Sequence, residues 1–340
     1  MRKWTWLLAL AVFALSACTP AGTGSNQSAR KIRIGLSLDT LREERWQRDR
    51  DIFVGRAREL GAEVIVEAAA SDDYLQRAQA ENMLGRGVDV LVVVPHDATA
   101  MAPVVAKAHE KGVKVIAYDR LIKAADVDLY VSFDNETVGR LQAEYLTKLV
   151  PKGNYVYIGG SKSDNNVFFL KQGAMSVLDP FRAKGDIRVV FEAWTPEWRP
   201  ENAERLMEEA LAQTGGKVDA VICGNDGTAG GAVRALYRHG LAGKVPVAGQ
   251  DADLQAVRRI VQGTQAMTVY KPIRELATRA AEVAVAMAKG ETPVTNATVN
   301  NDRGDVPAYL LQPIRVDRSN LRETVIRDGF HREEDVFVNE

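Results

Sequence analysis

Along most of the chain, short apolar runs alternate with longer segments in which apolar residues recur at helical spacing. From Lys31 onward the apolar runs, such as VDVLVVVP and VDAVICGND, are rich in β-branched residues and are bounded by Gly, Pro, Asp or Asn. The segments between them, such as YLQRAQAENMLGRG and ATAMAPVVAKAHEKG, have the period of amphipathic helices and end in glycine. This alternation is typical of βαβ units and parallel sheets.

The pattern predicts two α/β halves, each with its own parallel sheet. The helical segment ETVGRLQAEYLTKLV directly follows LYVSFDN, so a boundary between the halves is expected near Asp134 and Asn135. A last clear helix is expected over residues 273–290, followed by an irregular tail. The expected strands lie at 31–39, 63–68, 88–95, 113–120 and 129–135 in the first half, and at 154–161, 187–194, 218–226, 245–251 and 266–272 in the second.

Composition adds the size of the protein and narrows its partners. The chain has 340 residues, of which 46% are hydrophobic and 26% charged, and this length suits two domains with separate cores. The net charge is −1, with acidic and basic residues interspersed. No concentrated basic region marks a nucleic-acid binder or a membrane-surface binder, so a small or neutral ligand is expected.

The first residues predict export from the cytoplasm. Arg2 and Lys3 precede an apolar stretch that ends in small residues, which is the layout of a signal peptide over residues 1–17. Its end, LSAC, resembles the lipobox of bacterial lipoproteins, which implies that Cys18 becomes a lipid-modified N-terminus. Residues 18–30 would then form a flexible tether, and the protein would be extracytoplasmic and anchored to a membrane by lipid. The alternative is an ordinary signal peptide cut after Ala17.

Residues suited to catalysis or to metal binding are scattered. Cys223 is the only internal cysteine after the lipobox, so no intramolecular disulfide is expected. His96, His109, His239 and His331 form no metal-binding motif, and the chain lacks dinucleotide, Walker and nucleophile-elbow signatures. The sequence therefore predicts neither an enzyme nor a bound metal or cofactor.

Polar residues recur where the predicted strands end. Asp119 and Arg120 end one strand, and Asn225, Asp251 and Lys271 end or follow others. In open parallel sheets, ligands bind outside the carboxyl ends of the strands. Each residue taken alone could be a helix cap or a solvated side chain. Caps do not require an arginine or a lysine, however, so the set as a whole favours a binding site.

Tryptophan also stands near strand ends in both halves. Trp46 lies within the charged run LREERWQRDRD, and Trp194 and Trp198 lie within EAWTPEWRPENAE. Two aromatic rings across a cleft lined with hydrogen-bonding groups suit a sugar, which has apolar C–H faces and a rim of hydroxyl groups. Core packing is the alternative for Trp46 and the favoured interpretation for Trp194. These patterns alone indicate a small polar ligand in an interlobe cleft.

The runs ERWQ, AYDR, NDGTAGG, GQDADL and TVYKP carry a more specific likeness. With them, nearly the whole chain after Lys31 resembles the periplasmic sugar-binding proteins of ABC importers, in the ribose-binding-like family and within its D-xylose branch. The resemblance implies the type I periplasmic binding protein fold, in which two doubly wound lobes are joined by a three-crossing hinge. It implies an N-terminal lobe of residues 31–134 plus 272–300 and a C-terminal lobe of residues 135–271 plus 301–340.

The same resemblance implies the function and the site. A monomeric receptor would capture D-xylose between the lobes and deliver it to the membrane permease of an ABC importer. The alternatives are a receptor for another monosaccharide and a ligand-loaded sensor for a membrane histidine kinase. A DNA-binding repressor with the same core is excluded by the export signal, and no nucleic-acid partner is expected. The implied sugar contacts are Arg45, Trp46, Asp119, Arg120, Asn166, Trp198, Asn225, Asp251 and Lys271, with Asn165 as an adjacent candidate.

Overall fold

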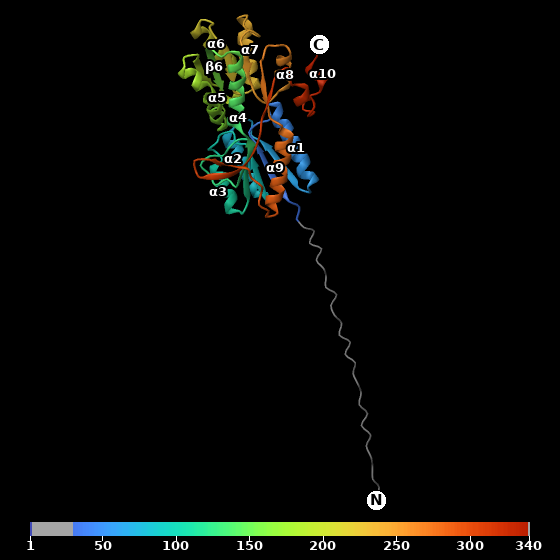
Figure 1. Cartoon of the computed structure of the whole chain (residues 1–340). Helices are drawn as coiled ribbons and strands as arrows, with labels where there is room; N and C mark the ends of the chain where they lie inside the picture. Colours follow the sequence, from blue (N-terminus) through green and yellow to red (C-terminus); the bar gives the residue numbers. More distant parts are fainter. Residues whose placement is uncertain (2–29, 339–340) are drawn as a thin grey trace. The chain divides into compact units, whose positions relative to one another are not determined.

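The computed structural model describes Met1 and residues 30–338. The expected signal peptide, Cys18 and nearly all of the expected tether therefore lie outside the described residues. Every described strand and helix lies after Lys31 (Figure 1).

The first sheet has seven strands and is parallel except at one edge. Its spatial order is β11-β12-β5-β4-β3-β1-β2. The first two strands of this order come from far along the chain, because β12 pairs parallel with β5 and β11 pairs antiparallel with β12. The bounds are β1 (Arg33–Leu38), β2 (Glu63–Ala68), β3 (Val90–Val93), β4 (Lys114–Tyr118), β5 (Leu129–Phe133), β11 (Ala297–Asn300) and β12 (Asp305–Leu311).

Helices cover both faces of this sheet, because successive strand residues point to opposite sides. Ile34 of β1 packs on one face with Phe53 and Leu276, which come from α1 and α9. Leu91 of β3 packs on the other face with Met83 of α2. Figure 1 shows α1 and α9 side by side. The bounds are α1 (Glu44–Glu59), α2 (Asp73–Gly85), α3 (Ala102–Glu110) and α9 (Ile273–Ala288).

The second sheet is parallel and has the order β7-β6-β8-β9. Helices α6 and α7 pack on one face, and α4 and α5 pack on the other. The bounds are β6 (Gly153–Gly159), β7 (Ile187–Trp194), β8 (Ala220–Cys223), β9 (Val247–Ala248), α4 (Asn135–Leu149), α5 (Asn166–Ala183), α6 (Pro200–Thr214), α7 (Asp226–Arg238) and α8 (Leu254–Val261).

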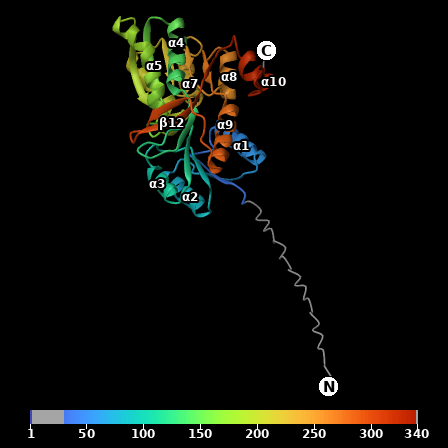
Figure 2. The same cartoon turned by 60° about the horizontal axis from the view of Figure 1, so that its bottom comes forward.

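The end of the chain also has regular structure. Strand β10 pairs antiparallel with β13, and the segments after β13 pack with α8 in a separate apolar cluster. The bounds are β10 (Thr268–Tyr270), β13 (Ile314–Val316), a 3-10 turn at Pro196–Trp198, a π-helix at Arg322–Ile326 and α10 (Glu333–Val336). Figure 2 shows the same elements from a second direction, with β12 labelled in the first sheet, where it lies between β11 and β5.

The chain passes between the two sheet layers at three places. It crosses at Asp134 between β5 and α4, at residues 271–272 between β10 and α9, and at residues 312–313 between β12 and β13. We call the layer around the seven-stranded sheet the first lobe and the layer around the four-stranded sheet the second lobe. Two α/β lobes with parallel sheets and three connecting segments agree with the expected fold class.

The ten expected strands all occur, but three expectations about the rest of the chain are wrong. The segment after α9 is not irregular, because it contains β11, β12 and β13. Residues 301–340 do not all belong to the second lobe either, because β12 hydrogen-bonds to β5 in the first sheet. The helix expected from residue 98 also begins later, at Ala102.

Candidate functional site

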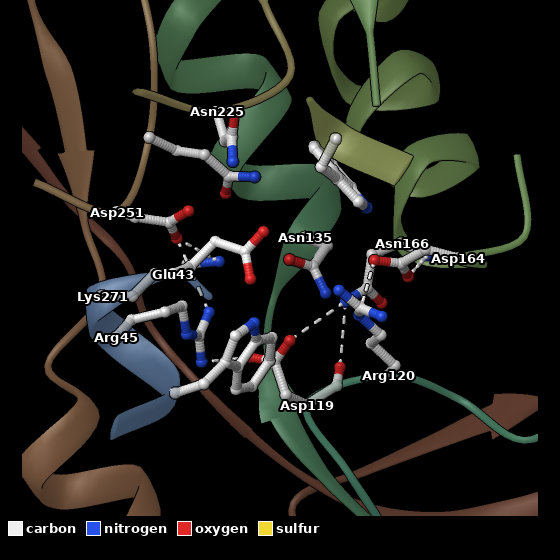
Figure 3. Close-up of a pocket in the computed structure, with 13 residues that line it drawn as sticks. Glu43, Arg45, Asp119, Arg120, Asn135, Asp164, Asn166, Asn225, Asp251 and Lys271 are labelled. Atoms are coloured by element: carbon white, nitrogen blue, oxygen red, sulfur yellow. Dashed lines mark hydrogen bonds and ion pairs between the residues drawn. The ribbon is translucent and has the colours of Figure 1, made fainter. Parts of the chain in front are cut away.

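A cavity lies between the carboxyl ends of the strands of the two lobes (Figure 3). The first lobe contributes the start of α1 and the residues after β4, and the second lobe contributes residues near the starts of α4, α5 and α7 and after β9. The lining residues are Glu43, Arg45, Trp46, Asp119, Arg120, Asn135, Asp164, Asn166, Trp198, Asn225, Gln250, Asp251 and Lys271.

Nine of the ten residues expected from the sequence line this cavity. Asn165 does not, because it stands at the N-cap of α5 and is buried away from the lining. Sequence reasoning missed Glu43, Asn135, Asp164 and Gln250. Asn135 and Gln250 follow strands of the same kind as the residues that were found, so the strand-end rule could have identified both.

Arg45 lies close to three carboxylates. Its Nη2 lies 2.7 Å from Asp119 Oδ2, its Nε lies 3.4 Å from Asp49 Oδ2, and its Nη1 lies 3.6 Å from Asp251 Oδ1. Burial alone would raise the pKa of Asp119, but Arg45 and Lys271 outweigh it and hold that pKa below its ordinary value. Since Asp251 belongs to the second lobe, the guanidinium group joins carboxylates from both lobes.

Asp251 is held in an uncommon backbone conformation. Its φ is +95° and that of Ala252 is +54°, in a region that few residues other than glycine adopt. The Asp251 N–H donates to the Val269 carbonyl at 2.8 Å, which ties this turn to β10. The Asp251 carboxylate lies 2.7 Å from Lys271 Nζ. The turn therefore places on the wall of the cavity an ion pair in which Lys271 is buried and Asp251 is nearly so.

Arg120 joins the two lobes directly. Its Nη1 donates to Asp39 Oδ2 at 2.7 Å in the first lobe, and its Nε lies 2.8 Å from Asp164 Oδ2 in the second. Burial would raise the pKa of Asp39, but Arg120 and His96 lower it to about 2. Burial raises the pKa of Asp164 although Arg120 opposes it.

The backbone of Asp119 organises the floor of the cavity. Its φ is +60°, and its carbonyl oxygen accepts hydrogen bonds from Tyr130 Oη at 2.9 Å, Ser132 Oγ at 2.6 Å and Asn166 Nδ2 at 3.0 Å. Asn166 Oδ1 also accepts from Tyr130 Oη at 3.2 Å. Asn166 was expected to bind the ligand, yet in this arrangement both polar atoms of its side chain contact the first lobe.

Asn225 is both a helix cap and a cavity residue. Its Oδ1 accepts from the Thr228 N–H at 2.8 Å, and Thr228 Oγ1 accepts from the Asn225 N–H at 3.0 Å, which completes a capping box at the start of α7. The cap occupies the oxygen and leaves the amide nitrogen as the donor for the cavity. Neighbouring Gln250 donates to the Gly224 carbonyl at 2.7 Å, and its Oε1 has no hydrogen-bond partner among residues 30–338.

The indole of Trp46 is covered by arginine. The guanidinium carbon of Arg45 lies 4.2 Å from the ring centroid, and that of Arg120 lies 5.3 Å from it, so both make cation–π contacts. Trp46 is only 4% exposed and also belongs to the apolar cluster of the first lobe. This explains why a tryptophan lies within a run of charges: its ring packs under the charged groups that line the cavity.

Two glycines make room for Trp198 on the second lobe. A Cβ atom at Gly160 would lie 2.1 Å from the Trp198 ring, and one at Gly224 would lie 2.9 Å from it. Trp198 itself has a φ of +56°, and its Nε1 is buried without a hydrogen-bond partner within the described part of the chain. Trp194 packs instead against Tyr157 and Phe168, as its core interpretation predicted.

The charges of the cavity nearly balance. Arg45, Arg120 and Lys271 face the carboxylates of Glu43, Asp119, Asp164 and Asp251, alongside amides and two indoles. Such a wall offers donors and acceptors in pairs and suits a neutral ligand with many hydroxyl groups.

The described residues were also compared with the requirements of a metal site and of a membrane-spanning helix. Residues 30–338 contain no group of three or more His, Cys, Asp or Glu side chains placed to hold a metal ion. No helix in this range is long and apolar enough to cross a membrane. Cys223 is buried, and burial raises the pKa of its thiol.

Comparisons with known proteins agree with this fold. A family model described as a periplasmic binding protein domain matches residues 34–292. The chain is 52% identical over 313 residues to the D-xylose-binding periplasmic protein of Haemophilus influenzae, covering 92% of this chain and 94% of the relative. It is 51% identical over 308 residues to the Escherichia coli protein of the same description, covering 91% and 93%. A solved structure of an ABC transporter solute-binding protein from Clostridium phytofermentans, with bound β-D-glucose, has a similar fold, with a TM-score of 0.83. That protein is 33% identical to this chain, and the match covers 89% of this chain and 99% of that one.

Proposed function

The chain belongs to the periplasmic binding protein family, and on this premise we propose that it captures D-xylose between its lobes for delivery to the permease of an ABC importer. The observation that carries the proposal is the near-neutral cavity walled by both lobes, in a chain 51% and 52% identical to two D-xylose-binding periplasmic proteins. These relatives are binding proteins, and this chain is likewise a binding protein and not an enzyme.

Capture depends on contacts from both sides of the cleft. A ligand shifts an equilibrium between open and closed lobes only by its difference in affinity for the two states. Arg45 and Asp119 offer contacts from the first lobe, and Asn225, Asp251 and Lys271 offer contacts from the second. A sugar that bridges these groups therefore favours closure, while one held by a single lobe would not.

The proposal extends to the location of the protein. It acts outside the cytoplasm, as periplasmic binding proteins do. We further propose that lipid modification of Cys18 anchors it to a membrane, that residues 18–30 form the tether, and that the receptor is a monomer. The LSAC sequence and the small, polar residues that follow it support the anchor.

The proposal predicts a large thermal shift with one sugar. Unfolding of the protein from Lys31 onward is followed with D-xylose, arabinose, ribose, glucose and galactose. A ligand at one hundred times its dissociation constant adds about 2.7 kcal/mol to the free energy of unfolding. We expect this stabilisation with D-xylose, and the same protein without sugar serves as the reference. Folded protein, free of any co-purified ligand, that is stabilised by none of these sugars would contradict the proposal.

A second candidate is a receptor with glucose as its main ligand. The similar solute-binding protein from Clostridium phytofermentans holds β-D-glucose. In the same thermal experiment, a larger stabilisation by glucose than by D-xylose at equal concentration would favour this candidate. The cavity chemistry is the same in both cases, since both ligands are neutral pyranoses.

Gly160→Ala is expected to weaken D-xylose binding by roughly tenfold to a hundredfold. The added methyl group would lie 2.1 Å from the Trp198 ring, so the ring must move within the cavity wall. Overpacking of this kind costs about 1–3 kcal/mol, and here the strain falls on a residue that lines the site. Calorimetry measures the affinity. Gly85→Ala is the matched control, because a Cβ there meets nothing within 4 Å, and its affinity should equal that of the wild type.

A further inference from the structure

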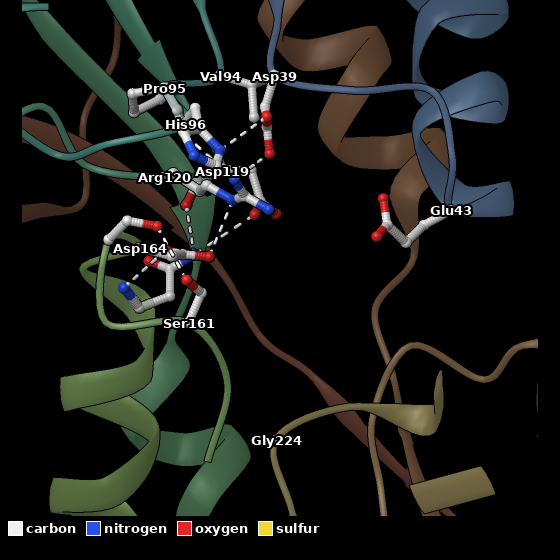
Figure 4. A network of polar contacts seen from close by, with 12 residues as sticks. Asp39, Glu43, Val94, Pro95, His96, Asp119, Arg120, Ser161, Asp164 and Gly224 are labelled. Atoms are coloured by element: carbon white, nitrogen blue, oxygen red, sulfur yellow. Dashed lines mark hydrogen bonds and ion pairs between the residues drawn. The ribbon is translucent and has the colours of Figure 1, made fainter. Parts of the chain in front are cut away.

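Four side chains of alternating charge run from the back of the first lobe to the second lobe (Figure 4). His96 Nδ1 lies 3.0 Å from Asp39 Oδ1, Asp39 Oδ2 accepts from Arg120 Nη1 at 2.7 Å, and Arg120 Nε lies 2.8 Å from Asp164 Oδ2. The side chains of Asp39, Arg120 and Asp164 are at most 6% exposed, while that of His96 is 16% exposed. Arg120 and Asp164 line the sugar cavity, whereas His96 and Asp39 stand behind it.

The backbone of His96 is anchored to helix α2 through Gln76. The His96 N–H donates to Gln76 Oε1 at 2.9 Å, and Gln76 Nε2 donates to the Val94 carbonyl at 2.8 Å. Gln76 is a buried residue of α2, so this contact ties the loop after β3 to the helix that covers it. This anchor holds the loop that places the His96 ring beside Asp39.

The surroundings of His96 are mainly acidic. Contact with Asp39 raises the pKa of His96 above its ordinary 6.5, although burial acts in the opposite direction. The second lobe contributes one of the nearby acids, Glu197, whose own pKa is lowered chiefly by Arg199 and to a smaller extent by His96. The charged groups that act on His96 are Asp39 after β1, Asp73 at the start of α2, the adjacent Asp97, Arg120 after β4 and Glu197 from the second lobe.

We propose that His96 is a positioning residue of the sugar site, whose positive charge helps Arg120 to pair with Asp164 across the cleft. The inference rests on the proposed function, because it concerns the closed arrangement in which a sugar is held. With His96 protonated, the group of Asp39, His96 and Arg120 carries a net charge of +1. Without that proton the group is neutral, and Asp39 competes with Asp164 for the same guanidinium.

The sign of the pH effect follows from this charge count. Closure brings Asp164 and Glu197 toward the first-lobe group, so it raises the pKa of His96 above that of the open form. Protonated His96 therefore favours closure. This contribution to closure is complete at a pH below the His96 pKa of the open form, and it is lost as the pH rises through the His96 pKa of the closed form. Sugar affinity is therefore highest at mildly acidic pH and falls above neutrality.

The test is calorimetric titration with D-xylose from pH 5.5 to pH 8.5. We expect the wild-type protein to bind about fivefold more tightly at the acidic end. His96→Gln, which is neutral and can still hydrogen-bond to Asp39, should keep the weaker affinity at every pH. His96→Lys, which keeps a positive charge, should keep the tighter affinity throughout.

A matched control separates this role from general histidine titration. His109 Nε2 lies 2.8 Å from Asp128 Oδ2, so the first lobe holds a second His–Asp pair, remote from the cavity lining. His109→Gln should keep the wild-type pH profile. Asp49, beside Arg45, also titrates in this range, because burial raises its pKa to about 6. Asp49 is present in both the wild type and His96→Gln, so the difference between their pH profiles isolates His96.

The outcomes distinguish the two proposals. If folded His96→Gln shows the same pH dependence as the wild type, His96 is not a positioning residue and the inference is wrong. If the wild type binds none of the sugars at any pH, the proposed function fails, and this inference fails with it. The contrast between His96→Gln and His96→Lys adds a readout that a purely structural role would not produce, since their difference lies in charge.

Discussion

Asp251→Ala is expected to abolish detectable binding of D-xylose in calorimetry. The carboxylate lies 2.7 Å from Lys271 Nζ and 3.6 Å from Arg45 Nη1, and both cations are buried. Removing one partner of a buried ion pair costs about 3–5 kcal/mol, which corresponds to a loss of affinity of roughly a hundredfold to several thousandfold. The Arg45 contact crosses the cleft, so the loss falls on the closed arrangement that holds the sugar. The effect should exceed that of Trp46→Phe, which keeps an aromatic ring.

Two further variants make this result interpretable. Asp251→Asn keeps the shape of the side chain, and asparagine tolerates positive φ better than alanine does, so it tests the charge alone. Asp126→Asn removes a carboxylate that only pairs with exposed Arg303 at 3.1 Å, and it should bind like the wild type. Near-unchanged affinity in Asp251→Ala would remove Asp251 from the site.

Arg45→Met is expected to lower the stability of the fold as well as the affinity for sugar. The Arg45 guanidinium lies between three carboxylates, those of Asp49, Asp119 and Asp251. Asp49 and Asp119 are buried. Without it, these acids face one another with less compensation, and the free energy of unfolding at pH 7.5 should fall by about 3–5 kcal/mol. Chemical denaturation measures this loss.

The pH dependence of the Arg45→Met variant gives a second check. Burial already raises the pKa of Asp49 from 3.8 to about 6, although Arg45 opposes the shift. When folding raises the pKa of a carboxyl group, the fold loses stability as the pH rises from the pKa of that group in the unfolded state to its pKa in the folded state. The variant, with a still higher pKa at this site, should therefore recover stability when the pH is lowered from 7.5 toward 5. Arg140→Met, which removes an exposed pair with Glu144, should change stability by less than about 1 kcal/mol at either pH.

The strands of the fold could be predicted because buried parallel strands appear as continuous apolar runs. Strand β12 escaped this rule, because its residues alternate between buried and exposed and it contains Pro307. Its place in the first sheet depends on pairing between residues such as Tyr130 and Ala308, which are far apart in the sequence. No local pattern encodes such a pairing, so the division of the lobes at residue 300 was wrong for this strand.

The cavity residues could be predicted for a similar reason. Strand ends gather at one edge of a parallel sheet, so Asp119, Asn225 and Asp251 were found from their positions alone. Asp164 was missed because it lies in a loop and matters through a tertiary contact with Arg120. The arrangement of Asn166 was not predictable either, since its contact with the Asp119 carbonyl exists only when the lobes meet.

The contacts that the two lobes make directly with each other bear on how the receptor is filled. Arg120 pairs with Asp164, the Ala98 N–H donates to the Ser163 carbonyl at 2.8 Å, and Arg42 Nη2 donates to the Glu197 carbonyl at 2.8 Å. Contacts between protein groups favour the closed shape whether or not sugar is bound, so they raise the closed fraction of the sugar-free receptor. The apparent dissociation constant equals that of the closed form divided by the fraction of sugar-free protein that is closed. If about one-tenth of the sugar-free protein were closed, binding would be weakened only about tenfold. A permease that recognised only the closed shape would then also bind closed receptors that hold no sugar. The strength of these few contacts between the lobes would determine how many such receptors compete with loaded ones.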